Sequence, residues 1–289
     1  MSLKFAKLHG LGNNYIYLDL VTQQTSFTNW EQLAKAVSDI NFGIGSDGLI
    51  LILPGSNGTD FRMRMFNSDG SEGRMCGNGI RCLAKYVYDN GLTKNECINV
   101  DTLAGRLQLS LQVVANRVEQ VRVNMGAPRL TRNELPMSIG DPNNQCLNEP
   151  LEVANQMVHI TAVSMGNPHA IIFVDNVQTA PVTTLGPLIE NHPAFPDRTN
   201  VEFIEVVTPQ HLKMRVWERG SGETMACGTG ACASTVAAIL LNKASRHCQV
   251  QLLGGTLDVE WAEDGDVYMT GPATYVADGH FCQQWLENV

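Results

Sequence analysis

The chain has 289 residues, a formal net charge of −9 at pH 7, and 44% hydrophobic against 17% charged residues. This is the composition of a folded globular protein, and the length allows one large domain or two of ordinary size. The negative charge and the lack of Lys/Arg runs exclude a protein that binds phosphate backbones, and no stretch approaches the roughly 20 apolar residues of a membrane span. We therefore expect neither a nucleic acid nor a membrane partner.

The cysteines and the N-terminal sequence bear on the compartment. No apolar segment of signal-peptide length precedes the first predicted elements, which predicts a cytoplasmic protein. In that reducing compartment the eight cysteines are expected to be free thiols. No two of them have C-x-x-C spacing, so we expect no metal site.

The first predicted helix lies within residues 27–40, FTNWEQLAKAVSDI. Thr28 and Glu31 have the spacing of a capping box, which would begin the helix at this point. Helical periodicity then places three apolar residues on one face, which indicates a surface helix with Leu33, Val37 and Ile40 turned inward.

The segment GIGSDG, residues 43–48, has the G-x-G-x-x-G spacing of a dinucleotide-binding loop. That motif requires a strand before the loop and a helix after it. Here the predicted helix comes first and the apolar strand LILIL follows. We therefore reject a nucleotide site.

Alternation of apolar and polar residues with a period of two predicts strands over much of the rest of the chain. Glycine-rich turns separate these strands, which favours antiparallel pairing. The clearest strands cover residues 61–66, 106–114, 120–125, 212–218 and 256–261.

Two Cys-Gly-x-Gly boxes, beginning at Cys76 and Cys227, each precede a predicted helix. After the first box, apolar residues recur at helical spacing as far as Asn90-Gly91, a C-cap pair. After the second, ACASTVAAILLN is apolar or small on every side, which is typical of a helix buried all round.

The two boxes are the centre of an internal repeat. Cys227 follows Cys76 by 151 residues, and the same offset aligns Asn67 with Glu218, and also Glu72 with Glu223. Upstream, GLGNNYIYLD and SMGNPHAIIFVD are both Gly-Asn turns that run into apolar strands. We infer two similarly folded halves.

The Pro/Gly/polar segment 125–136 is the best candidate for the linker between these halves. The expected division is an N-terminal half that contains Cys76 and a C-terminal half that contains Cys227. Their expected ranges are 1–125 plus 274–289, and 126–273.

A thiol at the first turn of a helix meets unpaired backbone N–H groups and the positive end of the helix dipole, which stabilise a thiolate. The glycines that flank Asn78 and Thr229 would let a carboxylate approach the same N–H groups. Inversion of a stereocentre by proton transfer requires one such thiol on each face of the substrate, in a groove between the halves. The duplicated boxes therefore point to a two-thiol epimerase or racemase.

Five motifs in order resemble the diaminopimelate epimerase family: LHGLGNNY, MFNSDGSEGRMCGNGIRC, SMGNPH, PDRTNVEF and WERGSGETMACGTGAC. The resemblance runs from Leu8 to about Gly279. It implies an α+β fold of two pseudo-symmetric halves, each a curved, mostly antiparallel sheet or barrel around a central helix. It also implies an isomerase that interconverts LL- and meso-2,6-diaminopimelate without pyridoxal phosphate or another cofactor, in the synthesis of lysine and peptidoglycan precursors.

The resemblance also assigns the site residues. Cys76 and Cys227 would be the acid/base pair, assisted by Glu218 and His169. The substrate contacts would come from the asparagines, one arginine and the two helix starts, namely Asn13, Asn67, Gly77, Asn78, Asn167, Asn200, Arg219, Gly228 and Thr229. The guanidinium of Arg219 suits a carboxylate at the far end of the substrate.

Two positions depart from the family pattern. Some members have Gln where this chain has Gly48, so only a backbone contact is expected there. Some members have Tyr where this chain has Ala277, a position that contributes to the family's dimer contact. The resemblance thus implies a homodimer in which this chain lacks one aromatic contact.

Three alternatives remain open. Proline racemases and hydroxyproline epimerases share the two-thiol logic, although Arg219 and the asparagines suit a longer substrate with a second charged end. A non-catalytic binding protein of this fold would be expected to lack a thiol, and both are present. A thiol-exchange protein would need a resolving cysteine nearby, whereas Cys82 and Cys232 lie one or two turns along their helices.

Overall fold

The computed structural model describes residues 3–289 and divides into two compact units. The first unit consists of residues up to Val123 together with Gly271–Val289, and the second is Asn124–Thr270. Met1 and Ser2, which begin the expected N-terminal half, lie outside the described residues. All eight cysteines are free thiols.

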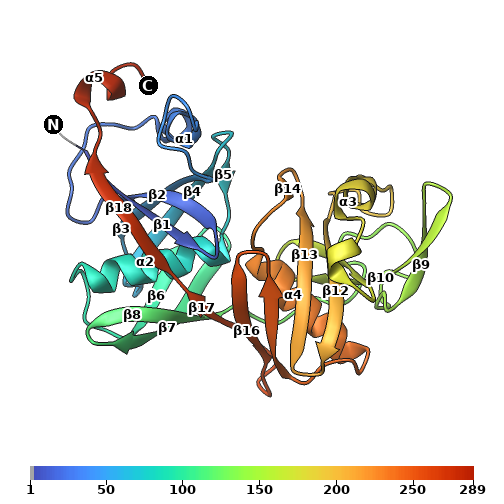
Figure 1. Cartoon of the computed structure of the whole chain (residues 1–289). Helices are drawn as coiled ribbons and strands as arrows, with labels where there is room; N and C mark the ends of the chain where they lie inside the picture. The colour runs from blue at the N-terminus through green and yellow to red at the C-terminus, as the bar shows by residue number, and fades with distance from the viewer. Residues whose placement is uncertain (1–2) are drawn as a thin grey trace. The chain divides into compact units, whose positions relative to one another are not determined.

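The first unit contains most of the N-terminal strands and the C-terminal segment (Figure 1). In chain order its elements are β1 (Lys4–Gly10), β2 (Asn13–Asp19), α1 (Trp30–Ser38), β3 (Gly48–Pro54), β4 (Phe61–Asn67), β5 (Glu72–Gly73), α2 (Gly77–Asp89), β6 (Cys97–Thr102), β7 (Gly105–Val114), β8 (Arg117–Asn124), β18 (Thr274–His280) and α5 (Gln283–Leu286).

The second unit repeats this succession of elements after an additional strand. Its elements are β9 (Glu149–Val153), β10 (Gln156–Ser164), β11 (Pro168–Phe173), the short 3-10 helix η1 (Val177–Thr179), α3 (Val182–Glu190), β12 (Asn200–Thr208), β13 (His211–Glu218), β14 (Gly222–Glu223), α4 (Gly228–Leu240), β15 (His247–Leu252), β16 (Gly255–Trp261) and β17 (Val267–Pro272).

Strand pairing follows the same plan in both units. In the first, β1–β2 and β3–β4 are antiparallel while β2–β3 and β4–β6 are parallel. In the second, β10–β11 and β12–β13 are antiparallel while β11–β12 and β13–β15 are parallel. The expected strands coincide with β4, β7, β8, β13 and β16, and most pairs are antiparallel, but the parallel pairs were not expected.

Each unit folds its strands around one helix (Figure 1). Helix α2 contacts β1, β2, β7 and β18, and α4 contacts strands β10 to β13, β15 and β16. The expected inward residues of α2 are fully buried, and the helix ends at Asn90 and Gly91, which has a φ of 74°. Ten of the thirteen residues of α4 are buried, which confirms a helix enclosed on all sides.

The internal repeat extends to the ion pairs. Arg64 contacts Glu72 at 2.7 Å, and Arg215 contacts Glu223 at 2.6 Å, at positions 151 residues further along. Both pairs join the first strand of a short hairpin to the second, just before a cysteine box. The two halves are therefore pseudo-symmetric, as expected.

Helix α1 corrects two expectations. It begins at Trp30 after Asn29, with no side-chain cap, so the capping box from Thr28 to Glu31 is wrong. It ends at Ser38, because Asp39 is extended and its carboxylate accepts hydrogen bonds from the backbone of the next turn. Ile40 therefore lies outside the helix and is 83% exposed rather than packed against the core.

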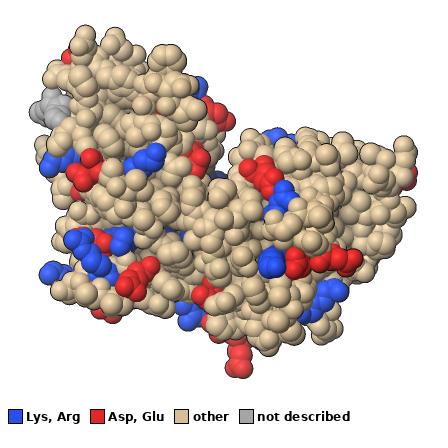
Figure 2. All heavy atoms as spheres, viewed as in Figure 1, with Lys and Arg blue, Asp and Glu red and all other residues tan. Residues whose placement is uncertain are grey.

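One face of the molecule carries charges of both signs (Figure 2). On the face drawn in Figure 2, acidic and basic side chains are interspersed among the described residues, and neither sign predominates. Within residues 3–289, no helix has the length and apolarity needed to cross a membrane.

Candidate active site

Cys76 caps the N-terminus of α2. Its backbone is extended, with φ −133° and ψ 120°, and its Sγ accepts a hydrogen bond from Gly79 N at 3.3 Å. The thiol donates to Asn13 Oδ1 at 3.3 Å. Asn13 lies at the start of β2, so the pairing of β2 inside the sheet brings it to the helix start.

Polar groups surround the Cys76 thiol. Asn78 Nδ2 donates to the same Asn13 oxygen at 3.2 Å, and Asn13 Nδ2 donates to Asp47 Oδ2 at 2.9 Å. Burial, together with the neighbouring Cys76 thiol, raises the pKa of Tyr15 well above its usual value. Tyr15 is therefore a neutral hydroxyl beside this thiol at physiological pH.

The buried side chain of Arg81 supports this helix start from within. It has no exposed surface and donates to Gly77 O at 3.1 Å, Asn78 Oδ1 at 2.9 Å and Pro272 O at 3.2 Å. It therefore fixes both the backbone and the side chain of the Gly77-Asn78 segment.

Cys227 caps the N-terminus of α4 in the same way. Its φ is −122° and its ψ is 111°, and its Sγ accepts from Gly230 N at 3.4 Å. The hydroxyl of Thr229 lies 3.5 Å from the sulfur. Burial raises the pKa of the Cys227 thiol well above its usual value, and the carboxylates of Glu218 and Glu202 raise it further.

Glu218 ends β13 and borders the Cys227 thiol. Burial raises the pKa of its carboxyl, while hydrogen bonds from Thr224 and Cys227 lower it. The hydroxyl of Thr224, in the loop before the cysteine box, donates to Glu218 Oε1. The carboxyl and the thiol therefore influence each other's protonation.

His169 is joined to the same helix start through Asn167. Its Nε2 lies 3.2 Å from Asn167 Oδ1, and Asn167 Nδ2 donates to Thr229 Oγ1 at 3.3 Å. Its Nδ1 lies 2.6 Å from Glu202 Oε1, and both side chains are fully buried. A continuous chain of contacts thus runs from Glu202 to the hydroxyl beside Cys227.

Three of the expected contact residues have other partners in this structure. Asn67 donates to Ser71 Oγ at 3.0 Å in the turn after β4. Asn200 is buried and bonds Pro168 O and the backbone N–H of Arg219. The exposed guanidinium of Arg219 donates to Asp197 O at 2.7 Å. None of these three has a recorded bond to either thiol within the described residues.

The backbone around Gly48 explains the absence of a side chain there. A Cβ on Gly48 would lie 2.0 Å from Phe66 O and 3.0 Å from Tyr15 Cε1. A Gln at this position would require the β3–β4 pair to move apart. The expectation of a backbone-only contact at Gly48 is consistent with this packing.

Five further residues contact the site without having been expected there from the sequence: Tyr15, Asp47, Arg81, Glu202 and Thr224. Glu202 could have been identified from the sequence, because it is a charged residue between Val201 and Phe203 inside an apolar strand. Tyr15 could have been identified from the repeat, because aligning Gly12-Asn13 with Gly166-Asn167 places Tyr15 at the position of His169.

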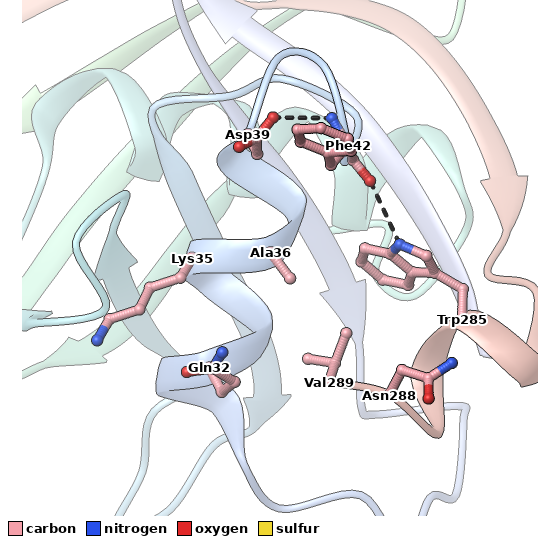
Figure 3. Close-up of a pocket in the computed structure, with 8 residues that line it drawn as sticks. All are labelled: Gln32, Lys35, Ala36, Asp39, Phe42, Trp285, Asn288 and Val289. Carbon is pink, nitrogen blue, oxygen red and sulfur yellow. Dashed lines mark hydrogen bonds between the residues drawn. The ribbon is translucent and has the colours of Figure 1, made fainter.

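A pocket of about 340 Å³ lies between α1 and the C-terminal helix α5 (Figure 3). Trp285 and Phe42 border it, and Trp285 Nε1 donates to Phe42 O at 3.3 Å. It includes none of the expected site residues. No group of three or more His, Cys, Asp or Glu side chains suited to a metal occurs in the described part of the chain.

The chemistry available at the two helix starts is acid/base chemistry. Each thiol accepts one backbone N–H, and each lies among groups that can hold or orient a proton. The first backbone N–H groups of each helix have no partner within the helix and can bind an anion. Each unit therefore combines a thiol with a helix end whose chemistry suits a carboxylate.

Comparison with known proteins gives the family. The model of a family described as diaminopimelate epimerase matches residues 5–131 and 161–276. A diaminopimelate epimerase of Pelotomaculum thermopropionicum is 52% identical over 279 residues, covering 96% of this chain and 99% of the relative. One from Oceanobacillus iheyensis is 51% identical over 283 residues, covering 97% and 98%.

Solved structures share the fold at low sequence identity. A probable proline racemase from Agrobacterium radiobacter superimposes with a TM-score of 0.72 at 14% identity, covering 97% of this chain and 93% of that one. A hydroxyproline epimerase from Agrobacterium vitis gives 0.72 at 12% identity, covering 98% and 93%. At these identities the likeness shows the α+β fold alone. The family match and the two sequence relatives show that this chain belongs to the diaminopimelate epimerase family.

Proposed function

We propose that this chain is an isomerase that interconverts LL- and meso-2,6-diaminopimelate by proton transfer at one α-carbon. The single observation that carries the proposal is the duplicated N-cap thiol, Cys76 on α2 and Cys227 on α4, in a member of this family. Relatives named diaminopimelate epimerase support this substrate over proline, because the proline racemase and hydroxyproline epimerase are similar in fold alone.

The proposed reaction moves one proton off the α-carbon and another onto it. One thiol, as thiolate, takes the α-proton, and the other thiol delivers its own proton to the opposite face of the carbanion. The first sulfur then carries a proton and the second is a thiolate, so the chain's residues alone balance the step. The reverse direction exchanges the two roles.

The helix ends supply the electrostatic stabilisation in this proposal. The N–H groups of Gly77-Asn78 and Gly228-Thr229 would bind the carboxylate on the reacting carbon, where negative charge increases in the transition state. Buried Arg81 and the chain Glu202–His169–Asn167–Thr229 hold these ends in place. Asn13, Asn67, Asn200 and Arg219 would contact the remote ammonium and carboxylate of the substrate.

The remaining parts of the proposal concern setting and assembly. The chemistry above is complete with the chain's own groups, so we propose an enzyme that works without a cofactor or metal. We also propose a cytoplasmic homodimer whose contact includes the exposed strand β18, and two halves whose division follows the repeat. The product would serve lysine and peptidoglycan precursor synthesis.

The test is turnover in deuterated water. Reduced protein, free of pyridoxal phosphate, is incubated with LL-diaminopimelate while product stereochemistry and α-deuterium are followed. We expect meso product that carries solvent deuterium at the inverted carbon. Deuterium exchange with proline or hydroxyproline instead would move the substrate to the related fold family.

The thiols are tested with Cys76→Ser and Cys227→Ser. A serine hydroxyl is too weak an acid to replace the thiol, so each change is expected to lower kcat by at least about 100-fold. Cys97→Ser, at an exposed cysteine on β6, is the matched control and should leave kcat unchanged. Near-normal turnover in either active-site variant would contradict the two-thiol assignment.

A further inference from the structure

The buried carboxylate of Glu202 is the starting point. Its side chain has no exposed surface, and Oε1 lies 2.6 Å from His169 Nδ1. The other oxygen, Oε2, has no hydrogen-bond partner among the described residues. A buried carboxylate is costly unless it is paired, so one that is only half satisfied calls for a functional explanation.

The carboxylate packs against the start of α4. A Cβ on Gly230 would lie 2.7 Å from Glu202 Oε1 and 3.2 Å from Cys227 Sγ. Gly230 also donates its backbone N–H to that sulfur. Glycine at this position therefore lets the carboxylate approach the first turn of the helix and the thiol that caps it.

The contacts define the direction of the hydrogen bonds. The Nδ2 group of Asn167 donates a hydrogen bond to Thr229, so the Oδ1 atom of Asn167 is the one that faces His169 Nε2. Because Oδ1 can only accept, Nε2 carries the hydrogen of this contact. On the other side of the ring, the short contact joins His169 Nδ1 to Glu202 Oε1. Glu202 therefore fixes the imidazole, and through it the amide and the Thr229 hydroxyl.

The other unit provides a built-in comparison. Strand register aligns Ile50, which pairs with Tyr17, with Glu202, which pairs with Ile171. A Cβ on Gly79 would lie 2.6 Å from Ile50 Cδ1, at the place where Gly230 meets the carboxylate. The same position behind the helix start is therefore apolar near Cys76 and acidic near Cys227.

We propose that Glu202 is a positioning residue specific to the Cys227 half: it aligns His169, Asn167 and Thr229 beside the sulfur, and its carboxylate disfavours the thiolate form of Cys227. The catalytic part of this inference rests on the proposed epimerase function. The effect of the Glu202 charge on the thiol does not, because it can be measured without substrate.

The titratable groups that face Cys227 come from three strands: Glu218 from β13, Glu202 from β12 and His169 from β11. The first turn of α4 carries no acidic residue, and its last turn no basic one. The other strands packed on α4 keep their charged side chains exposed or half-exposed, namely His159, His247, Asp258 and Glu260. Removing the Glu202 charge is therefore expected to stabilise the Cys227 thiolate.

The experiment compares Glu202→Gln with the wild-type protein, with Cys76→Ala added to both. Iodoacetamide alkylation of the Cys227 peptide is measured by mass spectrometry across pH, so that the exposed Cys97 and Cys282 do not interfere. We expect the alkylation profile to move to lower pH, because a neutral amide replaces the carboxylate that lies beside the first turn of α4. Glu205→Gln, the same change at a half-buried site on β12, should leave the profile in place.

In the background with both thiols, Glu202→Gln is expected to lower kcat/KM about tenfold. Glu202→Asp keeps the charge but withdraws it from His169, so it should lower kcat/KM while its alkylation profile stays near that of the wild type. If the Glu202→Gln protein does not fold, Glu202→Asp still tests the positioning role through its kcat/KM.

An unmoved alkylation profile in Glu202→Gln, or full kcat/KM in Glu202→Asp, would overturn the inference. If the wild-type protein shows no epimerase activity while the profile still shifts, the proposed function fails and the effect on the thiol remains.

Discussion

At the scale of single residues, Glu218 contributes to the site at a cost in stability. Burial raises the pKa of its carboxyl above 4.5, so the folded state binds the proton more tightly than the unfolded chain. That contribution to stability is fully present below pH 4.5 and is lost as the pH rises through the raised value. Ionisation of this carboxyl, which raises the pKa of Cys227, therefore costs folding free energy.

The change Glu218→Gln separates these two effects. Gln cannot ionise, so the melting temperature of the variant should fall less between pH 5 and pH 8 than that of the wild type, and kcat should drop by about 10- to 100-fold. Thermal unfolding followed by circular dichroism across this pH range provides the measurement. Glu260→Gln, at a half-buried site on β16, controls for the loss of one charge. Identical pH slopes in all three proteins would contradict the prediction.

At the scale of elements, local patterns predicted part of the fold. Period-two alternation located β4, β7, β8, β13 and β16, and the cysteine boxes located α2 and α4, because these signals lie within one element. The parallel pairs were missed because a parallel strand has the same side-chain period as an antiparallel one. The end of α1 was missed because the backbone of Asp39, rather than any break in periodicity, stops the helix.

The motifs named residues that lie together around each thiol. In the first unit, hydrogen bonds join Cys76 and Asn78 to Asn13; in the second, His169 contacts Asn167 and Glu218 borders Cys227. Their roles in catalysis and substrate binding stay predictions. Glu202 could not be joined to His169 from the sequence, because the contact spans 33 residues and depends on the parallel register of β11 and β12.

The repeated hairpins provide a test at this scale. Arg64 and Arg215 both bind a glutamate across their hairpin, but Arg215 also donates to Val177 O and Gln178 O. Arg64→Gln should therefore reduce the free energy of unfolding by about 0–1 kcal/mol, and Arg215→Gln by about 1–3 kcal/mol. Urea unfolding of the two variants measures the difference. Equal losses would mean that the two carbonyl contacts add nothing.

At the scale of the whole molecule, the proposed homodimer contact involves the exposed strand β18. Val276 on this strand is 53% exposed, and Ala277 beside it is exposed as well. If β18 forms the dimer contact, Ala277→Tyr should strengthen it, because a buried aromatic ring adds on the order of 1 kcal/mol and lowers the dissociation constant about fivefold.

Sedimentation velocity over a range of protein concentrations measures this change. The control is Leu253→Tyr, at a side chain that is 45% exposed in the turn between β15 and β16, which should leave the dissociation constant unchanged. Equal effects of the two substitutions, or no effect of either, would exclude β18 from the contact.

The exchange of Ile50 for Glu202 at equivalent positions has an evolutionary consequence. Two identical subunits that each supplied one cysteine would have to carry the same residue behind both helices, so every mutation would change both surroundings at once. Once the two copies are joined in one gene, each can mutate separately. Symmetry breaking of this kind lets one chain hold two chemically unlike sulfurs on a duplicated scaffold, and the Ile/Glu pair records where the copies diverged.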